Sequence, residues 1–282
     1  MALFPTVPDL QSQHHARGSS ADDIDFEIKG AEMQFIEIEL DPGESAVAEA
    51  GAMMFKHADI GMTSVFGDGS KQQQTGGFFG KLAGAGKRLL TGESLFTTVF
   101  THNGRGKARV AFAAPYAGHI LPMKLSEIGG TLICQKDAFL CAARGVSIGI
   151  AFQRKIMTGL FGGEGFIMQK LDGDGWVFVH AGGTVVQKEL AAGEVLHVDT
   201  GCIVAYLPGV DFDIERAGNI KSMMFGGEGV FFARLRGPGK VWIQSLPFSR
   251  LAGRMLAAAS PLGRSVDEGG MLGGIGDLLG GD

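Results

Sequence analysis

The feature that most constrains the fold of this chain is an internal duplication with an offset of 64 residues. The segment FGGEG occupies residues 161–165 and returns at residues 225–229. With that offset held fixed, residues 129–177 align with residues 193–241 without a gap. An ungapped match of this length, with an identical five-residue block, indicates two copies of one structural unit, and such units fold by packing against their neighbours.

A third and more diverged copy lies upstream of these two. Residues 31–55 share the pattern E-L-x-x-G-E with residues 181–205, and the middle copy, which starts at Ala117, keeps Leu125 and Gly129 in register. The copies therefore begin near residues 30, 116 and 181. A single copy of roughly 65 residues is too small to bury both faces of its own strands, so we expect the copies to pack together.

Each copy has the sequence pattern of β-structure. Apolar and polar residues alternate in MQFIEIEL and in VVQKEL, as in strands with one buried face. In each copy two apolar segments flank a turn, and we interpret each pair as a β-hairpin; the turns are Asn103-Gly104, residues 172–175 and residues 236–239. The predicted fold is all-β: three tandem β-sandwich-like repeats around a pseudo-threefold axis, with a short C-terminal helix.

On this interpretation the chain divides into consecutive segments. The helix is expected after the last strand because Leu251, Met255 and Ala258 share one helical face. The polar N-terminal stretch and the Gly-rich C-terminal stretch are expected to be flexible tails. In order, the segments are tail 1–23, repeat 24–115 with an insertion at 67–88, repeat 116–180, repeat 181–247, helix 248–260 and tail 261–282.

The composition narrows the class of protein. Hydrophobic residues make up 45% of the 282 residues, enough for a buried core, and the 46 glycines suit a chain with many tight turns. The net charge of −5 argues against nucleic-acid binding, which favours a basic surface. The three cysteines are scattered, and Cys134 and Cys141 are interpreted as buried thiols. With no long apolar run and no signal-peptide pattern, we expect a cytoplasmic protein.

No motif in the sequence predicts an enzyme. Gly80-Lys81 and Gly86-Lys87 lack both the upstream glycine and the following Ser or Thr of a phosphate-binding loop. The seven histidines and three cysteines do not have metal-ligand spacing, although His180 and His197 could meet in space. We therefore expect no catalytic residue, no metal site and no cofactor.

Two groups of residues are candidates for interaction. The first is an acidic residue in the same slot of each copy, which either accepts hydrogen bonds from loop N–H groups or forms a ring that binds a cation or a basic partner. The second is a basic amphipathic stretch in the insertion, which either packs on its own β unit or contacts a partner or a membrane surface. The residues are Glu93, Glu164 and Glu228 in the first group, and Phe78, Phe79, Lys81, Lys87 and Arg88 in the second.

Four segments together resemble the altered inheritance of mitochondria protein 24 family: FGGEG, AGAMM (50–54), RLLTGES (88–94) and KVWIQSLP (240–247). The resemblance covers residues 24–257 and implies tandem β units similar to the tryptophan RNA-binding attenuator fold, without an established enzyme activity. Eukaryotic relatives are linked to mitochondrial inner-membrane organisation, which implies a scaffolding role. This chain does not show the pattern of a mitochondrial presequence, so a bacterial cytoplasmic protein is expected.

The sequence favours a non-catalytic scaffold or interaction protein. Its expected contact is an unidentified protein partner, and peripheral membrane contact and homo-oligomerisation are further hypotheses. The alternative is a small-molecule binding protein with a pocket between the β repeats. A hydrolytic or metal-dependent enzyme ranks third, and RNA binding ranks last because the chain is acidic and fold alone does not carry function.

Overall fold

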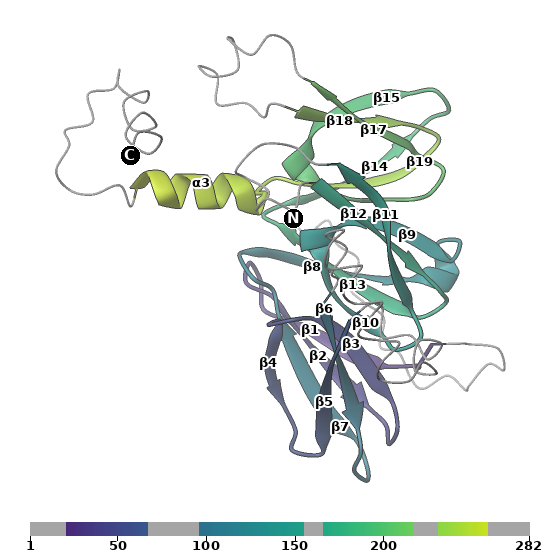
Figure 1. Cartoon of the computed structure of the whole chain (residues 1–282), viewed down its shortest axis with the longest axis vertical. Coiled ribbons are helices and arrows are strands. Elements are labelled where there is room, and N and C mark those ends of the chain that lie inside the picture. The colour runs from purple at the N-terminus through teal and green to yellow at the C-terminus, as the bar shows by residue number, and fades with distance from the viewer. Residues whose placement is uncertain (1–20, 67–95, 155–165, 217–230, 259–282) are drawn as a thin grey trace, which may run out of the picture.

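The chain is built mainly of β-strands in the computed structural model, which describes residues 21–66, 96–154, 166–216 and 231–258. Within these residues nineteen strands form four antiparallel sheets (Figure 1). One α-helix, α3 (Phe248–Ala258), follows the last strand. The β character and the short C-terminal helix expected from the sequence are confirmed.

The four sheets have the following strand orders, in which each strand stands next to its hydrogen-bonded neighbours. The first sheet is β1 (Asp25–Lys29), β2 (Phe35–Leu40), β7 (Ala108–Ala113) and β4 (Met53–Lys56). The second is β5 (Ile60–Phe66), β6 (Phe96–His102), β3 (Ser45–Glu49), β10 (Phe139–Ala143), β13 (Trp176–Gly182) and β8 (Gly118–Lys124). The third is β11 (Ser147–Arg154), β12 (Phe166–Asp172), β9 (Thr131–Gln135), β16 (Ile203–Tyr206), β19 (Gly239–Gln244) and β14 (Val185–Leu190). The fourth is β15 (Val195–Asp199), β18 (Phe231–Arg236) and β17 (Asp211–Arg216).

One pairing scheme occurs in three sets of six consecutive strands. We call β2–β7 the first set, β8–β13 the second set and β14–β19 the third set. In every set the last strand lies between the first and third strands, and the fifth lies between the second and fourth. A bulge interrupts the third strand of each set at the same point, between Met53 and Phe55, between Phe139 and Cys141, and between Ile203 and Ala205.

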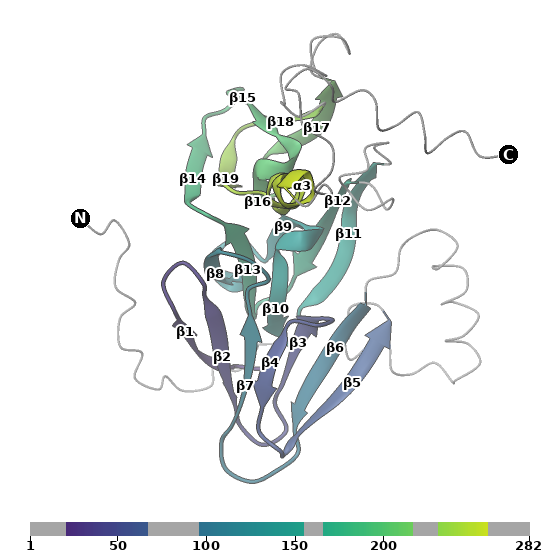
Figure 2. The same cartoon turned by 90° about the vertical axis from the view of Figure 1, so that its left-hand side faces the viewer.

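Adjacent sets are joined by one strand pair each. β3 pairs with β10, and β9 pairs with β16, so half of one set and half of the next share a six-stranded sheet. In Figures 1 and 2 the first set lies at one end of the long axis, the second in the middle and the third at the other end. Within the described residues, β4 and β15 do not pair with each other.

The three hairpins expected from the sequence are not formed. Strands are present on both sides of each turn, but β6 pairs with β3 and β5, whereas β7 pairs with β2 and β4. The same separation holds for β12 and β13 and for β18 and β19. At each turn the chain crosses from one sheet to another, and Asn103 does not have the positive φ that a tight two-residue hairpin turn requires.

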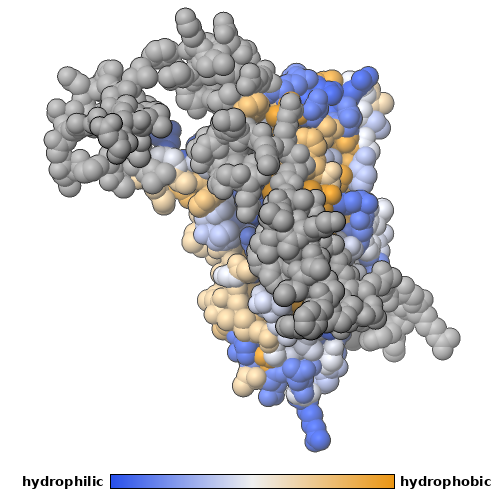
Figure 3. Space-filling view, viewed as in Figure 1, coloured by the Kyte–Doolittle hydropathy of each residue, from blue (hydrophilic) through white to orange (hydrophobic). Residues whose placement is uncertain are grey.

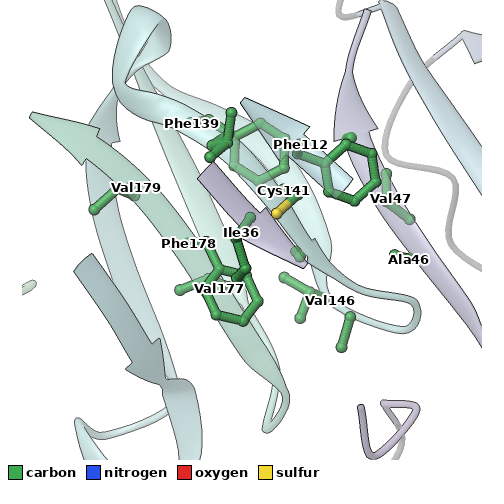
Figure 4. Packing of buried hydrophobic residues seen from close by; sticks show 14 of the residues in the cluster. Ile36, Ala46, Val47, Phe112, Phe139, Cys141, Val146, Val177, Phe178 and Val179 are labelled. Atoms are coloured by element: carbon green, nitrogen blue, oxygen red, sulfur yellow. The ribbon is translucent and has the colours of Figure 1, made fainter. Parts of the chain in front are cut away.

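Alternation along the strands builds the core. In β2, Ile36, Ile38 and Leu40 are fully buried, whereas the residues between them are partly exposed. Phe100 and Phe112, from the two sheets of the first set, meet edge to face with ring centroids 5.0 Å apart. Figure 4 shows the cluster continuing from the first set into the second. A second cluster joins β12 to the third set.

The residues just before β1 belong to the folded part. Ala21 and Ile24 are buried. A carboxylate oxygen of Asp22 accepts a hydrogen bond from the Ser45 N–H at 2.9 Å, and the Asp22 N–H donates to the Arg144 carbonyl at 2.8 Å. Residues 21–23, assigned to a flexible tail from the sequence, therefore connect β3 of the first set with Arg144, which follows β10 of the second set. Residues 1–20 lie outside the described part.

Candidate interaction surface

All eight candidate interaction residues from the sequence lie outside the described residues. The three acidic positions, Glu93, Glu164 and Glu228, fall between β5 and β6, between β11 and β12, and between β17 and β18. The insertion residues Phe78, Phe79, Lys81, Lys87 and Arg88 fall between β5 and β6 as well. The carboxylate ring and the amphipathic contact therefore stay predictions.

The outer edge of β4 is the most apolar exposed strand edge in the described part of the chain. Met53, Met54 and Phe55 are 36%, 54% and 38% exposed. The corresponding strands of the other two sets, β10 and β16, are buried along their whole length. Figure 3 shows a pale orange, apolar area on the side where β4 lies.

The exposure of β4 follows from its missing neighbour. β10 lies between β3 and β13, and β16 lies between β9 and β19, so both are central strands. β4 pairs with β7 and, among the described residues, has no strand on its other side. An edge of this kind presents unpaired backbone N–H and C=O groups to solvent and can pair with another chain.

β15 is the matching open edge at the far end of the molecule. Its counterparts have two neighbours each, since β3 lies between β6 and β10, and β9 lies between β12 and β16. β15 has β18 on one side and no described strand on the other. Val195 is 46% exposed, and the strand also exposes His197.

A charged network covers the outer face of the first sheet. Arg109 binds Glu37 at 2.7 Å and Glu39 at 2.9 Å, Lys29 binds Glu37 at 2.9 Å, and Lys107 binds Glu39 at 2.6 Å. The hydrogen bond from Lys29 lowers the pKa of Glu37, and the hydrogen bond from Lys107 lowers the pKa of Glu39. Because the charges satisfy one another, this face offers little net charge to a partner.

A buried polar cluster lies where β13 meets the segment before β8 and the start of α3. His180 is 1% exposed, and neither of its ring nitrogens has a hydrogen-bond partner of good geometry among the described residues. Its ring meets that of Tyr116 edge to face, with centroids 4.5 Å apart, and Tyr116 also contacts Phe248. Burial lowers the pKa of His180 to about 4 and raises the pKa of Tyr116 to about 12, so both groups are neutral at pH 7.

Glu49 is the second unusual titratable group. It ends β3 and is partly buried. Burial, reinforced by the charge of Asp137 and partly offset by Lys136, raises the pKa of Glu49 to about 7. The carboxyl group therefore titrates close to neutral pH.

Other residues that carry chemistry are dispersed through the described part. Cys134 and Cys141 are buried free thiols, as predicted, and burial raises the pKa of both. No three His, Cys, Asp or Glu side chains among the described residues are grouped to hold a metal ion. The structure, within the same residues, contains no helix of the length and apolarity that a membrane span requires.

Sequence reasoning missed both open edges. The run Met53–Phe55 is apolar at three successive positions, and such a run predicts a strand buried on both faces. β10 and β16 are buried along their whole length and β4 is not, because a local pattern does not determine how many neighbours a strand has. The signal that finds the edge is the pairing scheme compared across the three sets.

Comparisons with known proteins place the chain among relatives without a described activity. The family model described as "Mitochondrial biogenesis AIM24" matches residues 26–246. An uncharacterised protein of Streptococcus pyogenes serotype M6 is 30% identical over 228 residues, which are 79% of this chain and 86% of that protein. A crystal structure of a Streptococcus pyogenes protein is similar with a TM-score of 0.66 at 24% identity, covering 83% of this chain and 99% of the other.

Proposed function

The chain belongs to the AIM24 family, and from the open strand edges of β4 and β15 we propose that it is a non-catalytic scaffold that binds other protein chains by strand addition. The role expected from the sequence, an interaction protein, is retained, but the surface that carries it is different. The proposed contacts are β4 and β15, where backbone groups and apolar side chains are exposed together.

We further propose that the scaffold is three tandem modules of six strands. Two observations support this: the pairing order is the same in all three sets, and the bulge falls at the same point of the third strand. The offset of 64 residues found in the sequence relates the second and third bulges, since Phe139 and Cys141 correspond to Ile203 and Ala205.

The module arrangement that these pairings support is a row rather than a closed triad. A ring of three about a pseudo-threefold axis needs a third junction between β15 and β4, equivalent to those between β3 and β10 and between β9 and β16. These two strands stand at opposite ends of the long axis (Figure 1). A row leaves both of them available to partners.

The observation that carries the proposed function is the contrast between β4 and its counterparts. Cys141, Ala142 and Ala143 of β10 are fully buried by the neighbouring set, whereas Phe55 at the position of Cys141 is 38% exposed. Strand addition to an exposed edge uses backbone hydrogen bonds for affinity and side-chain contacts for specificity. The β4 edge supplies both.

Site-specific photo-crosslinking tests this proposal. The crosslinking amino acid p-benzoylphenylalanine would replace Phe55, and the matched control would carry it in place of Phe248, which is an aromatic residue of α3 with 53% exposure. We expect irradiation in cells to give a discrete protein adduct from the first position and not from the second. Equal adduct yields from the two positions, or none from position 55, would contradict the proposal.

A small-molecule binding role is the second candidate, and one observation favours it. His180 is buried, and neither of its ring nitrogens has a hydrogen-bond partner of good geometry among the described residues. Such groups are costly unless something satisfies them. On this hypothesis a metabolite would raise the thermal midpoint of the wild-type chain but not that of a His180→Phe variant. A broad metabolite panel without any such difference would count against it.

A further inference from the structure

We propose that the β4 edge of one copy of this chain pairs with the β15 edge of another copy, which extends the row of modules head to tail. This inference rests on the proposed function and names the partner as a second copy of the chain. It follows from the two junctions that the chain already contains, because the missing third junction is the one between β15 and β4.

The two internal junctions have one register. At the first, Ala48 of β3 faces Cys141 of β10, and Val47 faces Ala142. At the second, Cys134 of β9 faces Ala205 of β16. Both pairings are antiparallel and join the second strand of one set to the third strand of the next. The chain therefore forms this junction twice with different side chains.

The bulge in β4 and its pairing with β7 show which residues of β4 correspond to those of β10 in the first junction. Phe55 follows the bulge and faces Ala111 of β7, as Cys141 follows its bulge and faces Phe178 of β13. Phe55 is therefore the counterpart of Cys141, and Lys56 is the counterpart of Ala142.

The positions of β15 follow in the same way from β18. Val198 faces Ala233 of β18, as Cys134 faces Gln169 of β12, and the offset of 64 residues relates both pairs. Val198 is therefore the counterpart of Cys134, and His197 precedes it. The proposed junction places Phe55 of one copy opposite Val198 of the next, and Lys56 opposite His197.

The backbone groups at these positions point to the open side. The Arg144 N–H donates to the Ser45 carbonyl across the first junction, and the His102 N–H donates to the Glu44 carbonyl on the other side of β3. Because successive residues of an antiparallel strand face opposite neighbours, Val47 faces β10, and its counterpart His197 faces solvent. On β4 the His57 N–H donates to the Arg109 carbonyl of β7, so the preceding Lys56 faces outward.

The side chains of β4 and β15 lack the protection that β1, β8 and β14 carry at their sheet edges, and β5, which ends the second sheet, lacks it as well. β1 and β14 end their sheets with charged residues in sequence, DFEIK and VVQKEL, and β8 ends its sheet with Pro122. Charges and proline are the usual protection of a solvated edge. β4 instead carries Met53, Met54 and Phe55 before its single lysine, and β15 exposes Val195 and has neither lysine nor proline.

A junction of this kind is heterologous, because the two surfaces that meet are different. Each junction uses the β4 edge of one copy and the β15 edge of the next. An open assembly therefore always keeps one free edge of each kind, and it continues as a row or closes as a ring according to the rotation per copy. Blocking the same edge on every copy removes all junctions, whereas mixing copies that are blocked at different edges restores one junction. Because the two edges differ, each can be blocked separately, and the effect on association can be measured whatever the size of the assembly.

The test uses two proline variants of the full chain. Lys56→Pro and His197→Pro each remove one outward-facing N–H while keeping the bonds to β7 and β18, which proline tolerates on an edge strand. Lys56→Ala and His197→Ala are the matched controls, because they remove the same side chains and keep the N–H groups. Circular dichroism and the thermal midpoint of each variant verify that it is folded.

Sedimentation velocity and mass photometry supply the readout. We expect concentration-dependent oligomers from the wild-type chain and from both alanine controls, and only the 29.6 kDa monomer from either proline variant alone. An equimolar mixture of the two proline variants should give a dimer of twice that mass and nothing larger, since one supplies an intact β15 and the other an intact β4. A proline variant that dimerises by itself would overturn the inference in favour of like-edge pairing.

A disulfide test keeps the inference falsifiable if the proline variants do not fold. Copies with Phe55→Cys and copies with Val198→Cys should form a mixed disulfide dimer on oxidation, whereas Phe55→Cys mixed with Val186→Cys should not. Wild-type chain that stays monomeric at all concentrations, with no mixed disulfide, would end the inference. In that case an adduct between position 55 and a different protein would leave the proposed function standing, and the absence of any adduct would remove both.

Discussion

Replacing Glu49 by glutamine should make the chain more stable at alkaline pH and change little at acidic pH. Glu49 ends β3 beside the first junction, and its side chain is partly buried. Burial, reinforced by the charge of Asp137, raises its pKa from 4.5 to about 7. Glutamine keeps the shape of the protonated acid and cannot ionise, so the variant isolates the cost of placing a charge at this position.

The sign follows from proton binding in the two states. Between pH 4.5 and about pH 7 the folded chain holds a proton on Glu49 that the unfolded chain has released. The free energy of unfolding supplied by this group is therefore complete below pH 4.5 and is lost as the pH rises through about 7. A difference of about 2.5 in pKa corresponds to about 3 kcal/mol, and the partial exposure of Glu49 reduces our expectation to about 2 kcal/mol.

Urea unfolding at several pH values between about 5 and about 8 measures this effect. We expect Glu49→Gln and the wild-type chain to have similar free energies of unfolding at the acidic end, and the variant to gain about 2 kcal/mol over the wild type at the alkaline end. Glu127→Gln, at an exposed glutamate of the same chain, serves as the control for removing one surface charge. A constant difference between Glu49→Gln and wild type across the whole range would refute the reasoning.

Three further changes test other parts of the structure. Burial lowers the pKa of His180, so the wild type should lose up to about 3 kcal/mol of stability as the pH falls from 6.5 toward about 4. His180→Phe should not show this loss. Urea unfolding of both chains across that pH range measures the difference. Phe178→Ala should lower the free energy of unfolding by about 3–5 kcal/mol and Phe178→Leu by much less, since Phe178 is fully buried and meets Phe26 at 4.8 Å between ring centroids; equal losses would argue against a packed core at this site. Gly118→Ala should abolish folding, because a Cβ at Gly118 would collide with the Ala181 carbonyl, whereas Gly149→Ala has open space and should lower the thermal midpoint only slightly.

Strand positions could be predicted from the sequence because they depend on local pattern. The alternation in FIEIEL places Ile36, Ile38 and Leu40 inward, and the structure buries all three. Strand partners could not be predicted in the same way. A turn such as Asn103-Gly104 brings the chain back on itself, but it does not determine whether the next strand joins the same sheet or the opposite one. In the structure the next strand joins a different sheet at all three predicted hairpins.

The duplication was a better guide to pairing than the turns were. Because the offset of 64 residues holds from Gly129 to Val241, any pairing in the second set should recur in the third, and the bulges at Phe139 and Ile203 obey this. The acidic slot that the same alignment singled out falls outside the described residues. The alignment is consistent with the matching bulges of β10 and β16, while the tandem arrangement of copies and the role of the acidic slot stay predictions.

The open edges escape sequence analysis because a local pattern does not specify strand partners, and in the proposed row β4 and β15 lie at the two ends. β4 has the composition of a central strand, as β10 and β16 do, and only its place in the first set deprives it of a neighbour. Arrays of repeats need modified ends to stay soluble. In the proposed row one edge is modified in this way, since β1 covers the outer side of β2. That extra strand protects an edge that no junction uses and leaves β4 uncovered among the described residues. If the ends had been shaped only for solubility, β4 would be the strand to cover, so its apolar edge is better explained as a surface kept for pairing.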